Sequence, residues 1–97
     1  MRFTWNPQKS ARNQRERGFD FAFATLIFEG STLAREDHRQ DYGERRMVAI
    51  GLADGVALTV VFTDRVDAHD HLERRIISAR RSNRHERQAY QKALRST

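Results

Sequence analysis

Two runs of apolar, β-prone residues on either side of Asp54-Gly55 constrain the fold of this chain more than any other feature of its sequence. The first run is Arg46–Leu52 and the second is Val56–Thr63. Asp-Gly between two such runs predicts a hairpin, because both central residues of a type I′ turn need positive φ angles. Apolar residues at consecutive positions indicate strands that are buried on both faces, so we expect these two strands at the centre of a sheet.

Shorter signals before the hairpin predict one strand and two helices. Phe3–Trp5 is β-prone and is followed by Asn6-Pro7, which predicts a helix start because Asn caps helices and Pro suits the first helical position. This helix should run from Gln8 to Arg17 and end at Gly18, since glycine readily adopts the left-handed conformation that closes a helix. Residues 21–28 are apolar on nearly every side and predict a second, buried helix.

The remaining signals complete an α+β domain. Thr32–His38 weakly predicts an edge strand, and His71–Arg80 predicts another strand. Asn83 and Glu86 have the spacing of a capping box at the start of a final helix. The expected order is β-α-α-β-β-β-β-α around a central antiparallel sheet, and 97 residues are enough for a single domain of this kind, residues 1–97.

Positive charge is concentrated in the last quarter of the chain. Residues 74–97 contain eight basic residues and one acidic residue, whereas residues 1–73 carry a net charge of −2. A cationic surface of this kind attracts polyanions such as nucleic acids. The alternative is a solvated basic face, and the sixteen Arg against two Lys could equally reflect the base composition of the genome.

The residue inventory excludes several kinds of chemistry. The chain has no cysteine, which removes disulfides, thiolate catalysis and cysteine zinc sites. Its sequence contains no nucleophile-elbow, P-loop or zinc-protease motif. His69-Asp70-His71 lacks a third ligand at suitable spacing, so we expect a solvated loop there and no metal or cofactor. With no apolar run of about 18 residues, we expect a soluble cytoplasmic protein without a membrane segment.

Charged residues gather where the expected strands begin and end. Side chains alternate along a strand, so Arg74 and Arg80 should share one face of the sheet. Arg75 and Arg81 should share the other face. Such residues either keep the rim of the sheet solvated or form an arginine clamp for a phosphate. The residues concerned are Glu44, Arg46, Arg65, Arg74, Arg75, Arg80 and Arg81.

Motifs spread over residues 3–90 form a recognisable pattern. They are Trp5-Asn6-Pro7, Lys9, Asn13, Gly18, Phe21, Ala24, Gly43-Glu44, Arg46, Ile50-Gly51, Val60–Thr63, Arg75–Arg80, Glu86 and Tyr90. This pattern resembles the BrnT family of bacterial toxins, and Arg75–Arg80 is its most specific part. The resemblance implies a RelE-like fold and ribonuclease activity within a type II toxin–antitoxin module.

The resemblance also implies site residues. It assigns phosphate binding to Arg46, Arg75 and Arg80, and it makes Glu44 either a base or the residue that orients Arg46. Weaker RNA contacts are expected at Lys9, Arg17, Arg65, Arg81 and Arg84. The family usually has Asp at the position of Asn6 and Lys-His at that of Glu16-Arg17, so no histidine can be carried over as a catalytic acid or base.

The implied reaction is cleavage of RNA without a metal ion, by attack of the ribose 2′-OH on the adjacent phosphate. The implied partner is a BrnA-type antitoxin, which neutralises the toxin in a complex of two toxins on an antitoxin dimer and alone contacts operator DNA. Two other functions stay open. One is a catalytically silent module that binds nucleic acid or a partner. The other is an accessory DNA-binding protein, although the sequence has no recognition-helix pattern.

Overall fold

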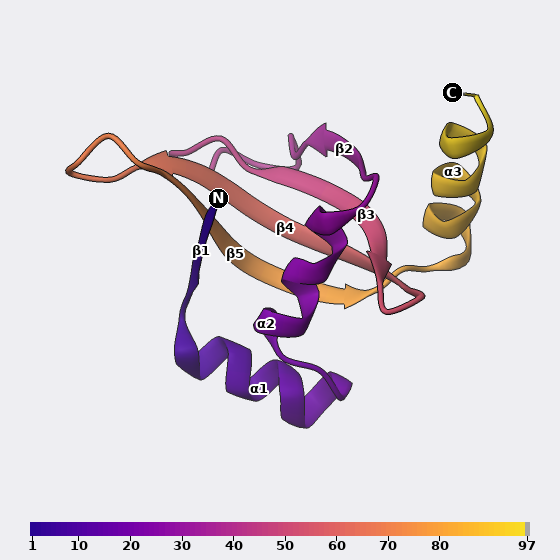
Figure 1. Cartoon of the computed structure of the whole chain (residues 1–97), viewed down its shortest axis with the longest axis horizontal. Coiled ribbons are helices and arrows are strands. Elements are labelled where there is room, and N and C mark those ends of the chain that lie inside the picture. The colour runs from indigo at the N-terminus through magenta and orange to yellow at the C-terminus, as the bar shows by residue number, and fades with distance from the viewer. Residues whose placement is uncertain (97) are drawn as a thin grey trace.

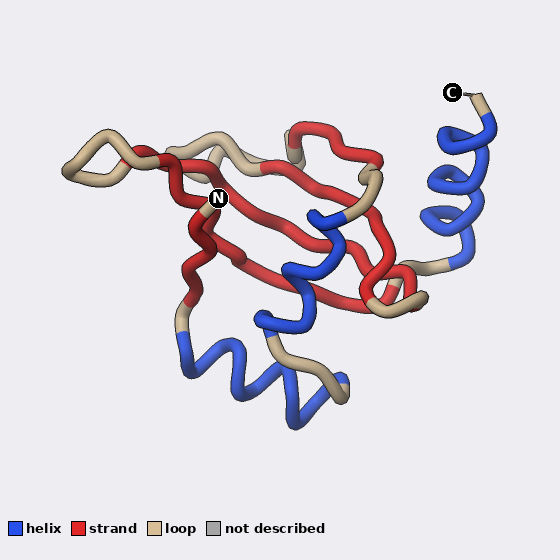
Figure 2. The backbone as a smooth tube through the Cα atoms, in the orientation of Figure 1, coloured by secondary structure: helices blue, strands red, loops and turns tan. Residues whose placement is uncertain are grey.

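A five-stranded mixed sheet in the order β1-β5-β4-β3-β2 forms the centre of the protein (Figure 1). The computed structural model describes residues 1–96. The strands are β1 (Arg2–Trp5), β2 (Leu33–Glu36), β3 (Met47–Ala53), β4 (Val56–Val66) and β5 (Leu72–Arg81). The helices are α1 (Pro7–Arg17), α2 (Phe21–Ala24), the 3-10 helix η1 (Thr25–Glu29) and α3 (Arg84–Arg95), and Figure 2 shows how they surround the sheet. The predicted α+β class is confirmed.

The β3–β4 hairpin is the one that the sequence predicts. Ala53 pairs with Val56 across the turn. Asp54 has a φ of 49° and Gly55 a φ of 79°, so both central residues are left-handed as a type I′ turn requires. The second strand is longer than expected, because β4 continues to Val66 and pairs with β5 from Leu58 to Val66.

The prediction of an antiparallel sheet is wrong at one edge. Strand β1 pairs parallel with β5, with Thr4 opposite Arg75 and Trp5 opposite Ile76. Hairpin turns fix the antiparallel direction of strands that follow one another in the chain. No such turn joins β1 to β5, so their relative direction follows from the path of the chain through α1 and the rest of the sheet.

Capping residues define both ends of α1. The Asn6 side chain accepts hydrogen bonds from the backbone N–H groups of Gln8 and Lys9, at 2.9 and 3.2 Å. Gly18, with a φ of 84°, closes the helix in the left-handed conformation. These are the boundaries that the sequence predicts for the first helix.

The predicted second helix has two parts, α2 and then η1. Asp20 caps α2 by accepting a hydrogen bond from the backbone N–H of Phe23 at 2.8 Å. The buried residues Phe21, Ala24 and Ile27 pack against one face of the sheet, which we call the helical face. A Cβ atom at Gly51 would lie 2.8 Å from Cβ of Ile27, so the glycine lets η1 approach β3 closely.

A bulge in β5 changes which arginines share a face. Ser78 pairs with Val61 and Ile76 with Phe62, so Ile77 is an extra residue in the ladder. The expected alternation through this strand is therefore wrong. Arg75 and Arg80 point to the same face, which we call the open face, because their partners on β4 are Thr63 and Thr59.

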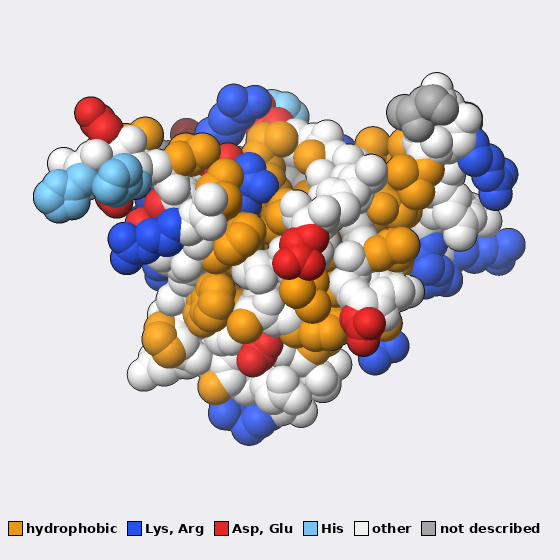
Figure 3. Space-filling model, viewed as in Figure 1, with side chains coloured by type: hydrophobic (Ala, Val, Ile, Leu, Met, Phe, Trp, Pro, Cys, Tyr) orange, Lys and Arg blue, Asp and Glu red, His pale blue; other side chains and the backbone are white. Residues whose placement is uncertain are grey.

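The other two arginines of β5 belong to the helical face. Arg74 lies over the rings of Phe28 and Phe62, 4.7 and 4.3 Å from their centres. Arg81 lines a crevice with Phe19 and other residues of that side. Figure 3 shows this side of the molecule, where apolar side chains gather around α2 and most basic side chains lie toward the margins.

Helix α3 covers only one end of the open face. Its capping box forms as predicted: the Asn83 side chain accepts from the N–H of Glu86, and the Glu86 side chain accepts from the N–H of Asn83. The buried Tyr90 attaches the helix to the β2 side of the sheet, because its hydroxyl donates to the Ser31 carbonyl at 2.8 Å. The other end of the open face carries no helix among residues 1–96.

Candidate functional site

Three basic side chains lie near enough to influence one another's charge at the end of the open face that α3 does not cover. Arg75 comes from β5, Arg46 directly precedes β3, and Lys9 reaches the same end from the first turn of α1. Burial lowers the pKa of Lys9, and the positive charges of Arg46 and Arg75 lower it further, followed by that of Arg12. We call Lys9, Arg46 and Arg75 the cationic cluster.

Arg46 is held in place by aromatic and acidic neighbours. Its guanidinium lies over the Tyr42 ring, 4.1 Å from the ring centre, and one of its terminal nitrogens is 3.5 Å from Glu44 Oε1. The side chain is 26 % exposed, and its Nε is buried without a hydrogen-bond partner within residues 1–96. The charge of Arg46 is thus fixed in position but only partly compensated.

Glu44 lies between two arginines. Its Oε1 faces Arg46, and its Oε2 is 3.4 Å from a guanidinium nitrogen of Arg65. The carboxylate therefore joins the start of β3 to the end of β4. Arg75, in contrast, has no ion pair within the part of the chain that the structure describes. Glu44, through Arg46, is the carboxylate that pairs with the cationic cluster.

Arg80 lies on the open face beside α3, and its charge is already paired. Its two terminal nitrogens donate to the two carboxylate oxygens of Glu86 at 2.7 and 2.8 Å. This hydrogen-bonded pair lowers the pKa of Glu86 to about 2 and raises the pKa of Arg80. The Arg80 side chain is 45 % exposed, so one edge of the guanidinium still reaches solvent.

The chain matches a known family over most of its length. The sequence model of the family described as "Ribonuclease toxin, BrnT, of type II toxin-antitoxin system" covers residues 5–86. The chain belongs to the BrnT family. A search of curated proteins gives no match to it. The family assignment confirms the resemblance recognised in the sequence, and it implies an antitoxin as partner.

Three further residues that the BrnT resemblance suggested as RNA contacts lie elsewhere. Arg17 donates a hydrogen bond to the Ala79 carbonyl at 2.7 Å and so joins α1 to β5. Arg81 belongs to the helical face, as described above. Arg84 is exposed at the start of α3. The structure does not bring these three residues to the cationic cluster.

The loop between β2 and β3 contributes residues that sequence analysis of this BrnT chain missed. Asp37 is buried and accepts hydrogen bonds from the side chains of Arg39 and Tyr42, at 2.8–2.9 and 3.1 Å. The Arg39 guanidinium holds the pKa of Asp37 well below its usual range. These bonds fix the Tyr42 ring beneath Arg46. In the sequence this segment is only a polar turn, and an aromatic residue four positions before an arginine was its one signal.

The histidine-containing loop between β4 and β5 has its own structural explanation. The Asp67 side chain accepts hydrogen bonds from the backbone N–H groups of His69 and His71, at 2.8 and 2.9 Å. These bonds lower the pKa of Asp67. Within residues 1–96, no group of three or more His, Asp or Glu side chains has an arrangement that could hold a metal ion. The same residues include no helix that is long and apolar enough to cross a membrane.

Proposed function

We propose that this chain is a toxin that cleaves RNA without a metal ion, through attack of the ribose 2′-OH on the adjacent phosphate. In this proposal the cleavage takes place in the cytoplasm and inhibits translation and growth. The observation that carries the proposal is the cationic cluster on the open face of a chain that belongs to a ribonuclease toxin family. The RelE-like fold that the resemblance implies is part of the same proposal.

The cationic cluster supplies what this reaction needs most. The phosphorane that forms in the transition state carries an additional negative charge, and fixed positive groups stabilise it most effectively when they are positioned beforehand. Like charges held close together repel each other, and a phosphate bound between them removes that repulsion. We therefore assign the scissile phosphate to Arg46 and Arg75, with Lys9 at its side.

Glu44 acts in this proposal by orienting the arginines. Its carboxylate lies 3.5 Å from a guanidinium nitrogen of Arg46 and 3.4 Å from one of Arg65, so it can hold both side chains in place. Arg65 is 48 % exposed and can contact a neighbouring phosphate of the RNA. Arg80 contacts the RNA backbone further along the open face through its exposed edge, while Glu86 keeps it in place.

Lys9 is the member of the cationic cluster that can exchange a proton. Guanidinium groups keep their protons in proteins, so Arg46 and Arg75 can only provide charge. The lowered pKa of Lys9 makes its ammonium a better proton donor than that of an ordinary lysine. We assign it the proton that the departing 5′-oxygen requires. The attacking 2′-OH belongs to the substrate and releases its proton to solvent water, so the chain itself need not supply a nucleophile.

The test is a single-turnover cleavage assay with purified chain, RNA and excess chelator. We expect cleavage to continue and the products to carry 2′,3′-cyclic or 3′-phosphate ends. Strict dependence on Mg²⁺ or Mn²⁺, or different ends, would contradict the mechanism. RNA that binds but stays uncut would identify the catalytically silent module instead, for which the replacement of the family histidine by Arg17 is the supporting observation.

The proposed partner is a BrnA-type antitoxin. In this proposal two toxin chains bind an antitoxin dimer, and the antitoxin makes the contacts with operator DNA. The positive charges of Arg17, Arg81 and Arg84, which lie away from the cationic cluster, attract RNA without contacting the scissile phosphate in this proposal. Mass measurement of the co-expressed pair tests the stoichiometry, and a toxin that remains a lone monomer in the presence of the antitoxin would contradict it.

A further inference from the structure

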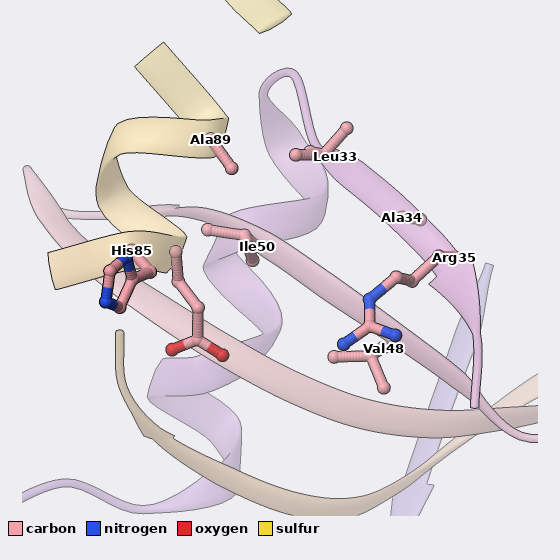
Figure 4. A pocket seen from close by; sticks show the side chains of 8 residues that line it. Leu33, Ala34, Arg35, Val48, Ile50, His85 and Ala89 are labelled. Atoms are coloured by element: carbon pink, nitrogen blue, oxygen red, sulfur yellow. The ribbon is translucent and has the colours of Figure 1, made fainter. Parts of the chain in front are cut away.

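An apolar groove separates α3 from the β2–β3 edge of the open face (Figure 4). Its cavity has a volume of about 300 Å³. Leu33, Val48 and Ile50 form its aliphatic side on the sheet, and Ala89 faces them from α3. A hollow of this volume that is lined mainly by apolar side chains can receive apolar groups of a bound partner.

The apolar surface continues along α3 beyond this groove. A second hollow, of about 330 Å³, lies next to it and shares Leu33 with it. On the helix side it is lined by Tyr90, Ala93 and Leu94. Together the two hollows extend along α3 from His85 to Leu94.

One end of the groove carries the positive charge of Arg35. In Figure 4 the Arg35 guanidinium lies over Val48 at one end of the groove, and Arg35 has no ion pair within residues 1–96. Glu86 lines the other end, but its carboxylate is already paired with Arg80. Helix α3 has four basic residues and this one acidic residue. A partner for the groove should therefore carry acidic groups beside its aliphatic ones.

The neighbouring edge of the sheet is also open. Strand β2 is the last strand of the sheet, with β3 on one side and no strand on the other within residues 1–96. An uncovered edge strand with aliphatic neighbours is a typical place for an added chain segment.

We propose that this groove binds the antitoxin, through a segment with aliphatic side chains that enter the hollow and acidic residues that pair with Arg35 and the basic surface of α3. This inference rests on the toxin–antitoxin part of the proposed function. A second copy of this chain fits poorly, because its net charge of +5 would bring like charges together. RNA fits poorly as well, because the lining of the groove is mainly aliphatic and His85 is the one residue of that lining with a ring for a base to stack on.

The test measures binding of the antitoxin encoded by the neighbouring reading frame, co-expressed and then purified as the probe. Ala89→Glu places a carboxylate in the groove, and Arg35→Glu reverses the charge at its rim. We expect each substitution to weaken binding at least tenfold. The matched controls are Gln88→Glu, on the adjacent exposed position of α3, and Arg15→Glu, on exposed α1, and both should bind within about twofold of the original chain.

Melting temperature and RNA cleavage are measured on the same variants. Both test positions lie outside the cationic cluster, so a folded variant that still cleaves RNA but escapes the antitoxin supports the groove. Unchanged binding by Arg35→Glu, equal losses in the controls, or no binding of the antitoxin to the original chain would overturn it. If the chain does not cleave RNA but the two groove variants still bind the antitoxin more weakly than their controls do, the ribonuclease proposal is contradicted and the proposal that the groove binds the antitoxin is supported.

Discussion

Arg80 and Glu86 form a two-pronged ion pair between the end of β5 and the first turn of α3, with N–O distances of 2.7 and 2.8 Å. The same Glu86 carboxylate accepts the backbone N–H of Asn83 and so completes the cap of α3. One carboxylate therefore fixes both the start of the helix and the direction of an arginine on the open face. Glu86 also lines the groove beside α3.

This ion pair predicts a specific dependence of stability on pH. The ion pair lowers the pKa of Glu86 from 4.5 to about 2. The ionised carboxylate therefore stabilises the folded state fully above about pH 4.5, and this stabilisation is lost as the pH falls toward 2. Glu86→Gln keeps an acceptor for the cap but removes the charge. The difference in unfolding free energy between the two chains should be largest above pH 4.5 and should shrink toward pH 2.

Urea denaturation at a series of pH values measures this difference. Glu16→Gln is the control, because Glu16 is exposed on α1 and has no ion pair within residues 1–96. A difference for Glu86→Gln that stays constant between pH 5 and pH 2 would show that the ion pair contributes no stability.

Arg75 and Arg81 lie on the same strand but on opposite faces, which makes them a sensitive pair for locating the site. Arg75→Gln should lower single-turnover RNA cleavage by roughly 10²–10³, the scale expected for loss of one preorganised group at the transition state. Arg81→Gln should only weaken RNA affinity, in a salt-dependent manner. Both variants should keep the melting temperature within a few degrees. Equal losses of cleavage would indicate a diffuse positive field in place of the cationic cluster.

Lys9 should make RNA binding depend on pH in a way that no arginine does. Its lowered pKa means that it loses its positive charge at a lower pH than an ordinary lysine. The affinity for an uncleavable 2′-O-methyl oligonucleotide should therefore fall as the pH is raised from 7 toward 10, and Lys9→Arg should reduce this fall. Lys92→Arg, at the other lysine of the chain, should leave it unchanged. Fluorescence anisotropy at constant ionic strength measures both.

Gly51→Ala should destabilise the fold by about 1–3 kcal/mol, because the added Cβ would meet Cβ of Ile27 at 2.8 Å in a packed region. Gly30→Ala is the matched control, since nothing lies within 4 Å of its added Cβ and its φ of −118° suits any residue. Chemical denaturation of the two variants measures the difference. Equal stability of both would mean that η1 moves away from β3 at little cost.

Local signals made much of the fold predictable. The Asp54-Gly55 turn, the Asn6 cap and the Asn83–Glu86 capping box each depend on a few neighbouring residues, and each appears as expected. The parallel pairing of β1 with β5 joins segments that are distant in the chain, so no local pattern encodes it. The extra residue at Ile77 is also set by pairing with β4, which alternation within a single strand does not show.

The candidate site was predictable as a set of residue types but not as a geometry. The family resemblance suggested Arg46, Arg75 and Arg80 for phosphate binding and Lys9 as a weaker contact. In the structure Arg46 and Arg75 lie near Lys9, whereas Arg80 lies beside α3, paired with Glu86. Their surroundings depend on contacts across the sheet and through the β2–β3 loop. The ring of Tyr42 beneath Arg46 and the carboxylate of Glu86 on Arg80 are such contacts, and they decide how much charge each arginine can offer to a ligand.

The bulge at Ile77 has a consequence for how the chain can vary in length. Arg80 follows Arg75 by five positions, and in a regular strand residues at this odd spacing would lie on opposite faces. Because Ile77 is an extra residue without a partner on β4, the two arginines are only four paired positions apart and lie on the same face. Loss of the codon for Ile77 would leave every other β4–β5 pair in register and both arginines on the open face. Evolution can therefore remove a residue at this position without moving the site, so the distance between these two arginines along a related sequence is a poor guide to whether they act together.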